Sequence, residues 1–240
     1  MVLLVLAIIL ALSTGASPAG PQKAPAQFKK EGAFTGGSKV SGVYLTGIRF
    51  GQHPDFLRIV LDFSVMKNGR FAGAPKHPPY RIEYGRFPYR FKVVLEGVKY
   101  SETATIQSQH AVPLSIVTSA DNSIQLIEFF ISRPALFKVI EIDDPAKLSL
   151  DVKYTATEPI PTVWAVQLQD VPDVETAFRL LNEFDFPEGY EPDLIVLGNS
   201  IFVEDTYLAL EAAAAMVSKL EEAGLPAMIT ERAGNELPRR

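Results

Sequence analysis

The spacing of hydrophobic residues changes along this 240-residue chain, near residue 160. Before that point, apolar and polar residues alternate over 57–63, 89–95 and 148–154. A period of two places one side of a strand against a core and the other in water. Further strand candidates, separated by turn residues, lie at 43–50, 80–84, 114–118, 124–132 and 136–142. Many short strands of this kind predict a mainly β domain, an antiparallel sandwich or barrel.

Beyond residue 162, the period lengthens to that of a helix. Residues 174–184 carry an apolar stripe at helical spacing, and Asp173 is placed to cap that helix. A second stripe predicts a helix over 208–223, which ends before Gly224. Strand patterns lie at 164–168, 194–197, 201–203 and 227–230. The order is β-α-β-β-α-β, an α+β unit in which two helices cover one face of a four-stranded sheet and leave the other face open.

These changes divide the chain into segments with different roles. We expect a signal peptide or N-terminal anchor at 1–19, a flexible linker at 20–38, a β-sandwich at 39–155, a Pro-rich linker at 156–162, the small α+β domain at 163–230, and a mobile tail at 231–240. Because the hydrophobic period switches at the Pro-rich linker, the two domains are expected to have separate cores.

The first segment indicates export. Residues 2–12 are an unbroken apolar run, followed by small residues suited to a cleavage site. As a helix the run spans about 16 Å, too short for a hydrocarbon core of about 30 Å. No Lys or Arg precedes it, so an uncleaved anchor is one alternative, and a buried N-terminal helix is another. We expect a location in the periplasm or cell envelope, with membrane contact only through this segment if it is uncleaved.

Charge separates the two halves of the chain. Residues 160–240 carry 5 basic and 15 acidic residues, whereas the whole chain has a net charge of −5. The asymmetry indicates two domains with different surfaces, or two solvated faces of unlike composition. The negative net charge of the whole chain disfavours a dedicated nucleic-acid-binding protein. Residues 67–99 are basic and rich in aromatic residues, which predicts either a surface for a polyanion or the wet face of ordinary strands.

The residue inventory argues against catalysis. The chain has no cysteine and three histidines, which excludes a disulfide scaffold, a thiolate zinc site and a cysteine nucleophile. No nucleophile-elbow, zinc-protease, P-loop or dinucleotide-binding motif occurs. His53 and His77 each precede a proline and are expected in solvated loops. We therefore predict no enzyme activity, no catalytic residue, no cofactor and no metal site.

The first domain resembles a known family. Residues 47–63 (GIRFGQHPDFLRIVLDF), 80–84 (YRIEY) and the late strand 144–152 (DPAKLSLDV) are similar to AMIN-like domains, with Lys147 in place of a more usual arginine. The resemblance covers nearly the whole segment, although its motifs are strand patterns. It implies a β-sandwich used for cell-wall association or for localisation of envelope proteins.

The second domain resembles the SPOR family. Residues 164–180 look like the first half of a SPOR domain, and residues 201–229 look like the second half. The resemblance implies binding of peptidoglycan glycan strands that lack stem peptides, through the sheet face opposite the helices. The chain departs from two motifs: the family's Q-x-G-x-F becomes QLQDV at 167–171, and R-V-x-x-G-P-F becomes FVEDTY at 202–207.

A glycan site on that face needs stacking rings and hydrogen-bonding groups. Trp164, Phe202 and Tyr207 are the candidate rings, and Gln167 is the candidate hydrogen-bonding partner. Core packing is the alternative for Trp164 and Phe202. The sequence thus predicts a non-catalytic envelope protein that binds peptidoglycan and localises to the wall or division septum, with envelope or division proteins as further partners. The alternative is an envelope adaptor or accessory protein that binds protein partners instead of glycan.

Overall fold

The computed structural model describes residues 27–107, 112–119, 124–155 and 159–239. The predicted signal peptide or anchor at 1–19 lies outside these residues. Among the described residues, none of the helices combines the length and the apolar character that a membrane span needs.

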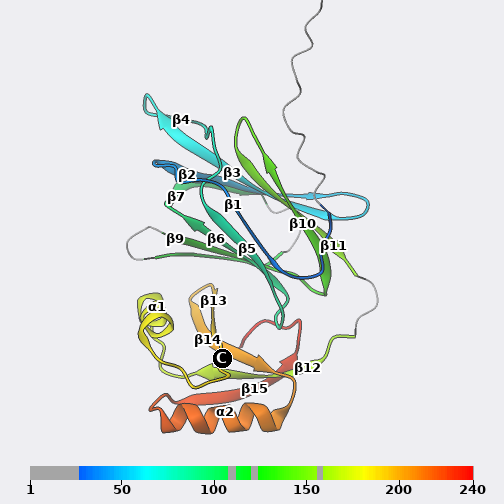
Figure 1. Cartoon of the computed structure of the whole chain (residues 1–240), viewed down its shortest axis with the longest axis vertical. Coiled ribbons are helices and arrows are strands. Elements are labelled where there is room, and N and C mark those ends of the chain that lie inside the picture. The colour runs from blue at the N-terminus through cyan, green and yellow to red at the C-terminus, as the bar shows by residue number, and fades with distance from the viewer. Residues whose placement is uncertain (1–26, 108–111, 120–123, 156–158, 240) are drawn as a thin grey trace, which may run out of the picture.

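The larger unit is a sandwich of two β-sheets (Figure 1). One sheet has the order β1-β5-β6-β9-β8, and the other has the order β10-β11-β3-β2-β7, with β4 paired to β3. Its strands are β1 (Ala33–Gly36), β2 (Val43–Gln52), β3 (Leu57–Lys67), β4 (Arg70–Gly73), β5 (Tyr80–Gly85), β6 (Arg90–Glu96), β7 (Val98–Gln107), β8 (Leu114–Thr118), β9 (Ile124–Phe130), β10 (Ala135–Ile142) and β11 (Lys147–Tyr154). The prediction of a mainly β class is confirmed.

Alternation along the strands builds the sandwich core. In β3, the side chains of Leu57, Ile59, Leu61 and Phe63 are buried, and the residues between them are half-buried on the outer face. Inward residues of both sheets join one hydrophobic cluster. The pairing is antiparallel except between β2 and β7, which are parallel, so the expected purely antiparallel arrangement is wrong at that edge.

The sandwich begins earlier in the chain than predicted. The proposed linker 20–38 contains β1, which pairs with β5. Phe34 is half-buried and packs against the core, with its ring centroid 5.5 Å from that of Phe137. Four residues with a single large side chain carry too short an alternation to be recognised as a strand, which explains the error.

The smaller unit has the predicted β-α-β-β-α-β order. It consists of β12 (Thr162–Leu168), α1 (Val174–Glu183), β13 (Asp193–Leu197), β14 (Ser200–Tyr207), α2 (Leu210–Glu222) and β15 (Ala227–Ala233). The sheet order is β13-β14-β12-β15, antiparallel throughout. Asp173 caps α1 as expected, because its carboxylate accepts a hydrogen bond of 2.7 Å from the Thr176 amide.

The C-terminal segment is packed, contrary to the prediction of a mobile tail at 231–240. Strand β15 continues to Ala233, and Arg232 within it is buried. Asn235 Nδ2 donates to the Ser132 carbonyl at 3.0 Å, and Leu237 joins a small apolar cluster with Phe130 and Phe202. The described part of this segment therefore ties the small unit to the sandwich.

The two units share apolar contacts. The sheet of the small unit lies between the sandwich and α2 (Figure 1). Val117 and Leu126 of the sandwich belong to the hydrophobic cluster that holds the small unit's helices. The main cluster of the sandwich contains no residue of the small unit, so the expected separation of cores holds there, but it does not hold at the contact between the units.

The sandwich core yields a test with a matched pair of phenylalanines. Phe137 is fully buried and contacts the rings of Phe34, Tyr84 and Phe91, whereas Phe71 is 41% exposed. We expect Phe137→Ala to lower the free energy of unfolding by about 3–5 kcal/mol, because a large cavity replaces the ring. Phe71→Ala should lower it by less than about 1 kcal/mol. Denaturant titration of both variants checks this, and equal losses would contradict the described core.

Candidate functional site

The four predicted glycan-binding residues lie on the two central strands of the small sheet. Trp164 and Gln167 are on β12, and Phe202 and Tyr207 are on its neighbour β14. The expectation that these strands are adjacent at the sheet centre is confirmed. Within a strand, however, side chains alternate between the two faces, so the four residues do not share one surface.

Trp164 and Tyr207 lie on the helix side of the sheet. They are directly opposite each other in the β12–β14 register, and both pack against the cluster that includes α1 and α2. The Tyr207 hydroxyl donates to the Gly189 carbonyl at 3.0 Å. Burial raises the pKa of Tyr207 well above its ordinary value, and the nearby Asp205 carboxylate adds to the effect. These two rings are therefore half-buried and already engaged.

Phe202 and Gln167 lie on the opposite face, which is covered. Phe202 is 2% exposed and packs with Ile195 and Phe130, the last of which belongs to the sandwich. Gln167 is 8% exposed, and Val163 and Ala165 on the same face are fully buried. The prediction of an open sheet face opposite the helices is wrong, because the sandwich occupies it. Phe202 cannot stack on a sugar while the two units are in contact.

Buried ion pairs cross the covered face. On the sandwich side, the Arg90 guanidinium lies 2.9 Å from a Glu128 oxygen, and both residues are buried. Arg90 and Lys92 also bond the carboxylate of Asp193, which belongs to β13 of the small unit. These two cations come from the basic stretch 67–99. They are neither the wet strand face nor the polyanion surface proposed from sequence, because they serve the contact between units.

A second ion pair lies on the small unit itself. Arg232 of β15 donates to the carboxylate of Glu204 on β14, at 3.1 Å for one of the two bonds. The same guanidinium donates to the Phe87 carbonyl of the sandwich at 3.4 Å. Both charged residues are buried, so neither is free to bind a ligand from solution.

These surroundings shift two carboxyl groups in opposite directions. Burial raises the pKa of Glu128 to about 7, and the attraction of Arg90 offsets only part of that effect. Burial also acts on Asp193, but Arg90 and Lys92 outweigh it and lower its pKa below the ordinary value. Glu128 therefore takes up a proton near neutrality, whereas Asp193 stays ionised.

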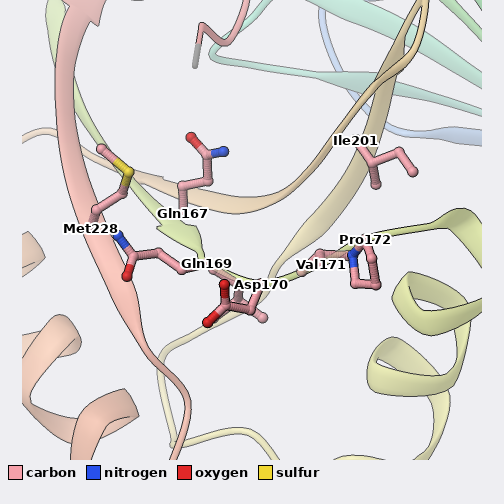
Figure 2. Close-up of a pocket in the computed structure, with 8 residues that line it drawn as sticks. Gln167, Gln169, Asp170, Val171, Pro172, Ile201 and Met228 are labelled. Atoms are coloured by element: carbon pink, nitrogen blue, oxygen red, sulfur yellow. The ribbon is translucent and has the colours of Figure 1, made fainter.

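An open pocket lies at the carboxyl end of β12 (Figure 2). Its volume is about 580 Å³. The lining combines polar and apolar side chains: Gln167, Leu168, Gln169, Asp170, Val171, Pro172, Ile201 and Met228. All of its lining residues belong to the small unit, and Gln169, Asp170 and Met228 among them are exposed.

The strand register places the pocket's groups. Gln167 lies directly opposite Met228 on β15, so both point to the same side of the sheet. The backbone N–H of Gln169 donates to the Pro226 carbonyl at 2.8 Å, and this bond holds the start of the loop against β15. The next residue, Asp170, has a φ of 58°, a left-handed conformation that aspartate tolerates better than most residues. This turn directs the chain from β12 toward α1.

The pocket offers hydrogen-bonding groups beside an apolar wall. Gln169 and Asp170 are exposed and supply an amide and a carboxylate, while Met228 is 41% exposed and supplies apolar surface. Among the described residues, no group of His, Asp and Glu side chains is arranged to hold a metal ion. His77, which was predicted in a solvated loop, is buried instead, with Nε2 3.0 Å from the carbonyls of Ile142 and Lys147.

Sequence reasoning selected only one residue of this pocket, Gln167. It missed Gln169, Asp170, Ile201 and Met228. The available signal was the segment 167–171, where the chain departs from the SPOR-like motif and gains an amide and a carboxylate. Comparisons of the chain with protein-family models, with curated proteins and with solved structures find no match.

The buried Glu128 predicts a pH dependence of stability. Because its pKa rises from 4.5 to about 7 on folding, its contribution to stability is full below pH 4.5 and is lost as the pH rises through 7. We expect the thermal midpoint of the wild-type protein to fall over this window. Glu128→Gln, which imitates the protonated form, should flatten that part of the profile. An unchanged slope in the variant would contradict the assignment.

Proposed function

We propose that this protein is a non-catalytic glycan-binding protein of the cell envelope, and that its sugar site is the pocket at the end of β12. The observation that carries the proposal is the composition of the lining: two amides and a carboxylate beside Met228 and Ile201. Sugars present hydroxyl groups around their edges and C–H groups on their faces, which suits a lining of this mixed kind. A volume near 580 Å³ also falls in the range of about 300–1,000 Å³ typical of small-molecule sites.

The sequence resemblances supply the chemical class of the ligand. The β-α-β-β-α-β order supports the SPOR-like interpretation of the small unit, and the two-sheet sandwich supports the AMIN-like interpretation of the larger one. The ligand proposed from them is the peptidoglycan glycan strand, in its form without stem peptides. Export to the periplasm or envelope, with localisation to the wall or septum, belongs to the same proposal.

The covered sheet face changes where such a glycan would bind. Of the four residues proposed from sequence, Gln167 keeps a place in the pocket, and Phe202 does not reach it. The covered face also weakens the adaptor alternative, because a protein partner that uses this sheet face would first have to displace the sandwich.

Binding in this pocket should depend little on salt. The region 160–240 is acidic, and Asp170 adds a negative charge within the pocket, so long-range attraction cannot recruit an anionic polymer. Hydrogen bonds and apolar contacts remain, and these are short-ranged. Titration of the full chain with stem-peptide-free glycan at low and high salt checks this, and binding that vanishes at high salt would place the site elsewhere.

Asp170→Gly separates binding from folding. Glycine accepts the left-handed backbone at this position, so we expect the free energy of unfolding to change by less than about 1 kcal/mol. Loss of a hydrogen bond to a charged group should weaken glycan binding about tenfold. Pull-down with sacculi, with and without stem peptides, measures the effect. The matched control is Asn182→Ala, an exposed polar residue on α1 outside the pocket, which should bind like the wild type. If both variants bind equally well, the pocket is not the glycan site.

A further inference from the structure

The β3–β4 hairpin projects from the end of the sandwich that lies away from α1 and α2 (Figure 1). Strand β3 pairs with β11 only as far as Asp62 and then continues against β4 from Ser64 to Lys67. The turn is Asn68-Gly69, and both residues have a positive φ. This is the short turn that suits the twist of a tight hairpin.

Two large apolar side chains near the tip are exposed. Met66 is 48% exposed and Phe71 is 41% exposed, and the two residues lie directly opposite each other in the register. Tyr44 of β2 extends the group, because its ring contacts that of Phe71 with centroids 5.3 Å apart. Single exposed apolar residues are ordinary on a protein surface. Three adjoining large side chains at one projecting end are a patch.

Basic side chains lie next to this patch, on both faces of the hairpin. Lys67 and Arg70 are the cross-strand pair nearest the turn, and Lys99 lies over the Tyr44 ring at 6.0 Å. The side chains of Lys67 and Arg70 form no ion pair or hydrogen bond with any residue that the structure describes. No acidic residue occurs in the segment 64–73 or in the first five residues of β2.

The nearest carboxylate along β3 is already neutralised. Asp62 receives two hydrogen bonds from the Arg49 guanidinium, at 2.6 and 2.8 Å. Within the segment 64–73 the positive charge therefore has no counter-charge, although the chain as a whole is negative and the exposed Asp143 and Asp144 lie in the neighbouring β10–β11 turn. Such a local reversal of sign favours an anionic surface as the partner.

We propose that the β3–β4 hairpin binds the surface of a lipid bilayer that carries anionic headgroups. Met66 and Phe71 enter the boundary between headgroups and acyl chains. The long side chains of Lys67, Arg70 and Lys99 extend beside them to the lipid phosphates. A soluble polyanion would satisfy the cations but would leave Met66 and Phe71 in water. The proposal is independent of glycan binding, because the pocket lies in the small unit at the other end of the molecule.

The absence of cysteine allows a local test. Asn68→Cys places the only thiol at the turn, where an environment-sensitive fluorophore reports membrane contact. We expect the label on the full chain to shift to the blue, and to be shielded from iodide, with vesicles of phosphatidylcholine and phosphatidylglycerol. The control Ser218→Cys, on exposed helix α2, should show neither change. Because the readout is local, binding through the apolar segment 2–12 does not imitate it.

Two double variants test the separate roles of the apolar and the basic side chains. Met66→Ser with Phe71→Ser should abolish shielding while circular dichroism stays unchanged, because both side chains are exposed. Lys67→Gln with Arg70→Gln should lower the ratio of shielded to exposed label about 30-fold, since each basic residue near an anionic leaflet strengthens binding about fivefold. Equal shielding with vesicles of pure phosphatidylcholine would overturn the anionic partner. No shielding with either vesicle, or shielding only with a soluble polyanion, would overturn the proposal.

Discussion

Burial of the small unit's sheet against the sandwich is the contact on which the rest of the molecule depends. The outer side of the five-stranded sheet presents Arg90, Lys92 and Phe130, and the small unit presents Asp193 and Phe202. This contact gives the molecule successive layers: two sheets, a third sheet, and α2 on its far side (Figure 1). A four-stranded sheet with helices on one side exposes an apolar face unless something covers it, and here the same chain provides the cover.

The charges within this contact fix its geometry more than they add to its strength. Removing a carboxylate and a guanidinium from water is unfavourable, and their attraction restores the loss only when the pairing is close. Arg90 meets this condition because its guanidinium forms ion pairs with Glu128 on its own sheet and with Asp193 on the other unit. Arg232 likewise donates hydrogen bonds to Glu204 on its own sheet and to the Phe87 carbonyl across the contact. Sliding one unit over the other would leave buried charges without partners, so the pairs specify one register.

Much of the fold could be predicted from local patterns, because the spacing of apolar residues in a strand or helix reflects which of its side chains are buried. The strand at 114–118 has the predicted ends, the strand predicted at 148–154 begins one residue earlier, and Asp173 caps α1. Strand β7 was missed because VKYSETATIQ lacks a clear alternation. The ion pairs could not be predicted, since Arg90 and Asp193 are about a hundred residues apart and nothing local records their contact.

The covered face did leave a signal in the sequence. Residues 163–168 (VWAVQL) are apolar at nearly every position, which is typical of a strand buried on both faces. The open face was expected from the β-α-β-β-α-β order, and this run argued against it. For the candidate site, the sequence indicated a residue but not the neighbours that complete the pocket. Gln167 could be chosen for its chemistry, but Met228 becomes its neighbour only through the antiparallel register of β12 and β15.

The layered arrangement also determines how a ligand can approach. With the sheet face closed, a polymer has access to the small unit at strand ends and loops, and the pocket at 167–172 is such a place. The contacts of Asp193, Arg232 and Asn235 with the sandwich hold the small unit in one orientation. The pocket and the β3–β4 hairpin are therefore held at opposite ends of one body (Figure 1). A molecule built in this way can keep a bound surface and a bound polymer apart at a fixed separation, which a flexible tether between two free domains cannot do.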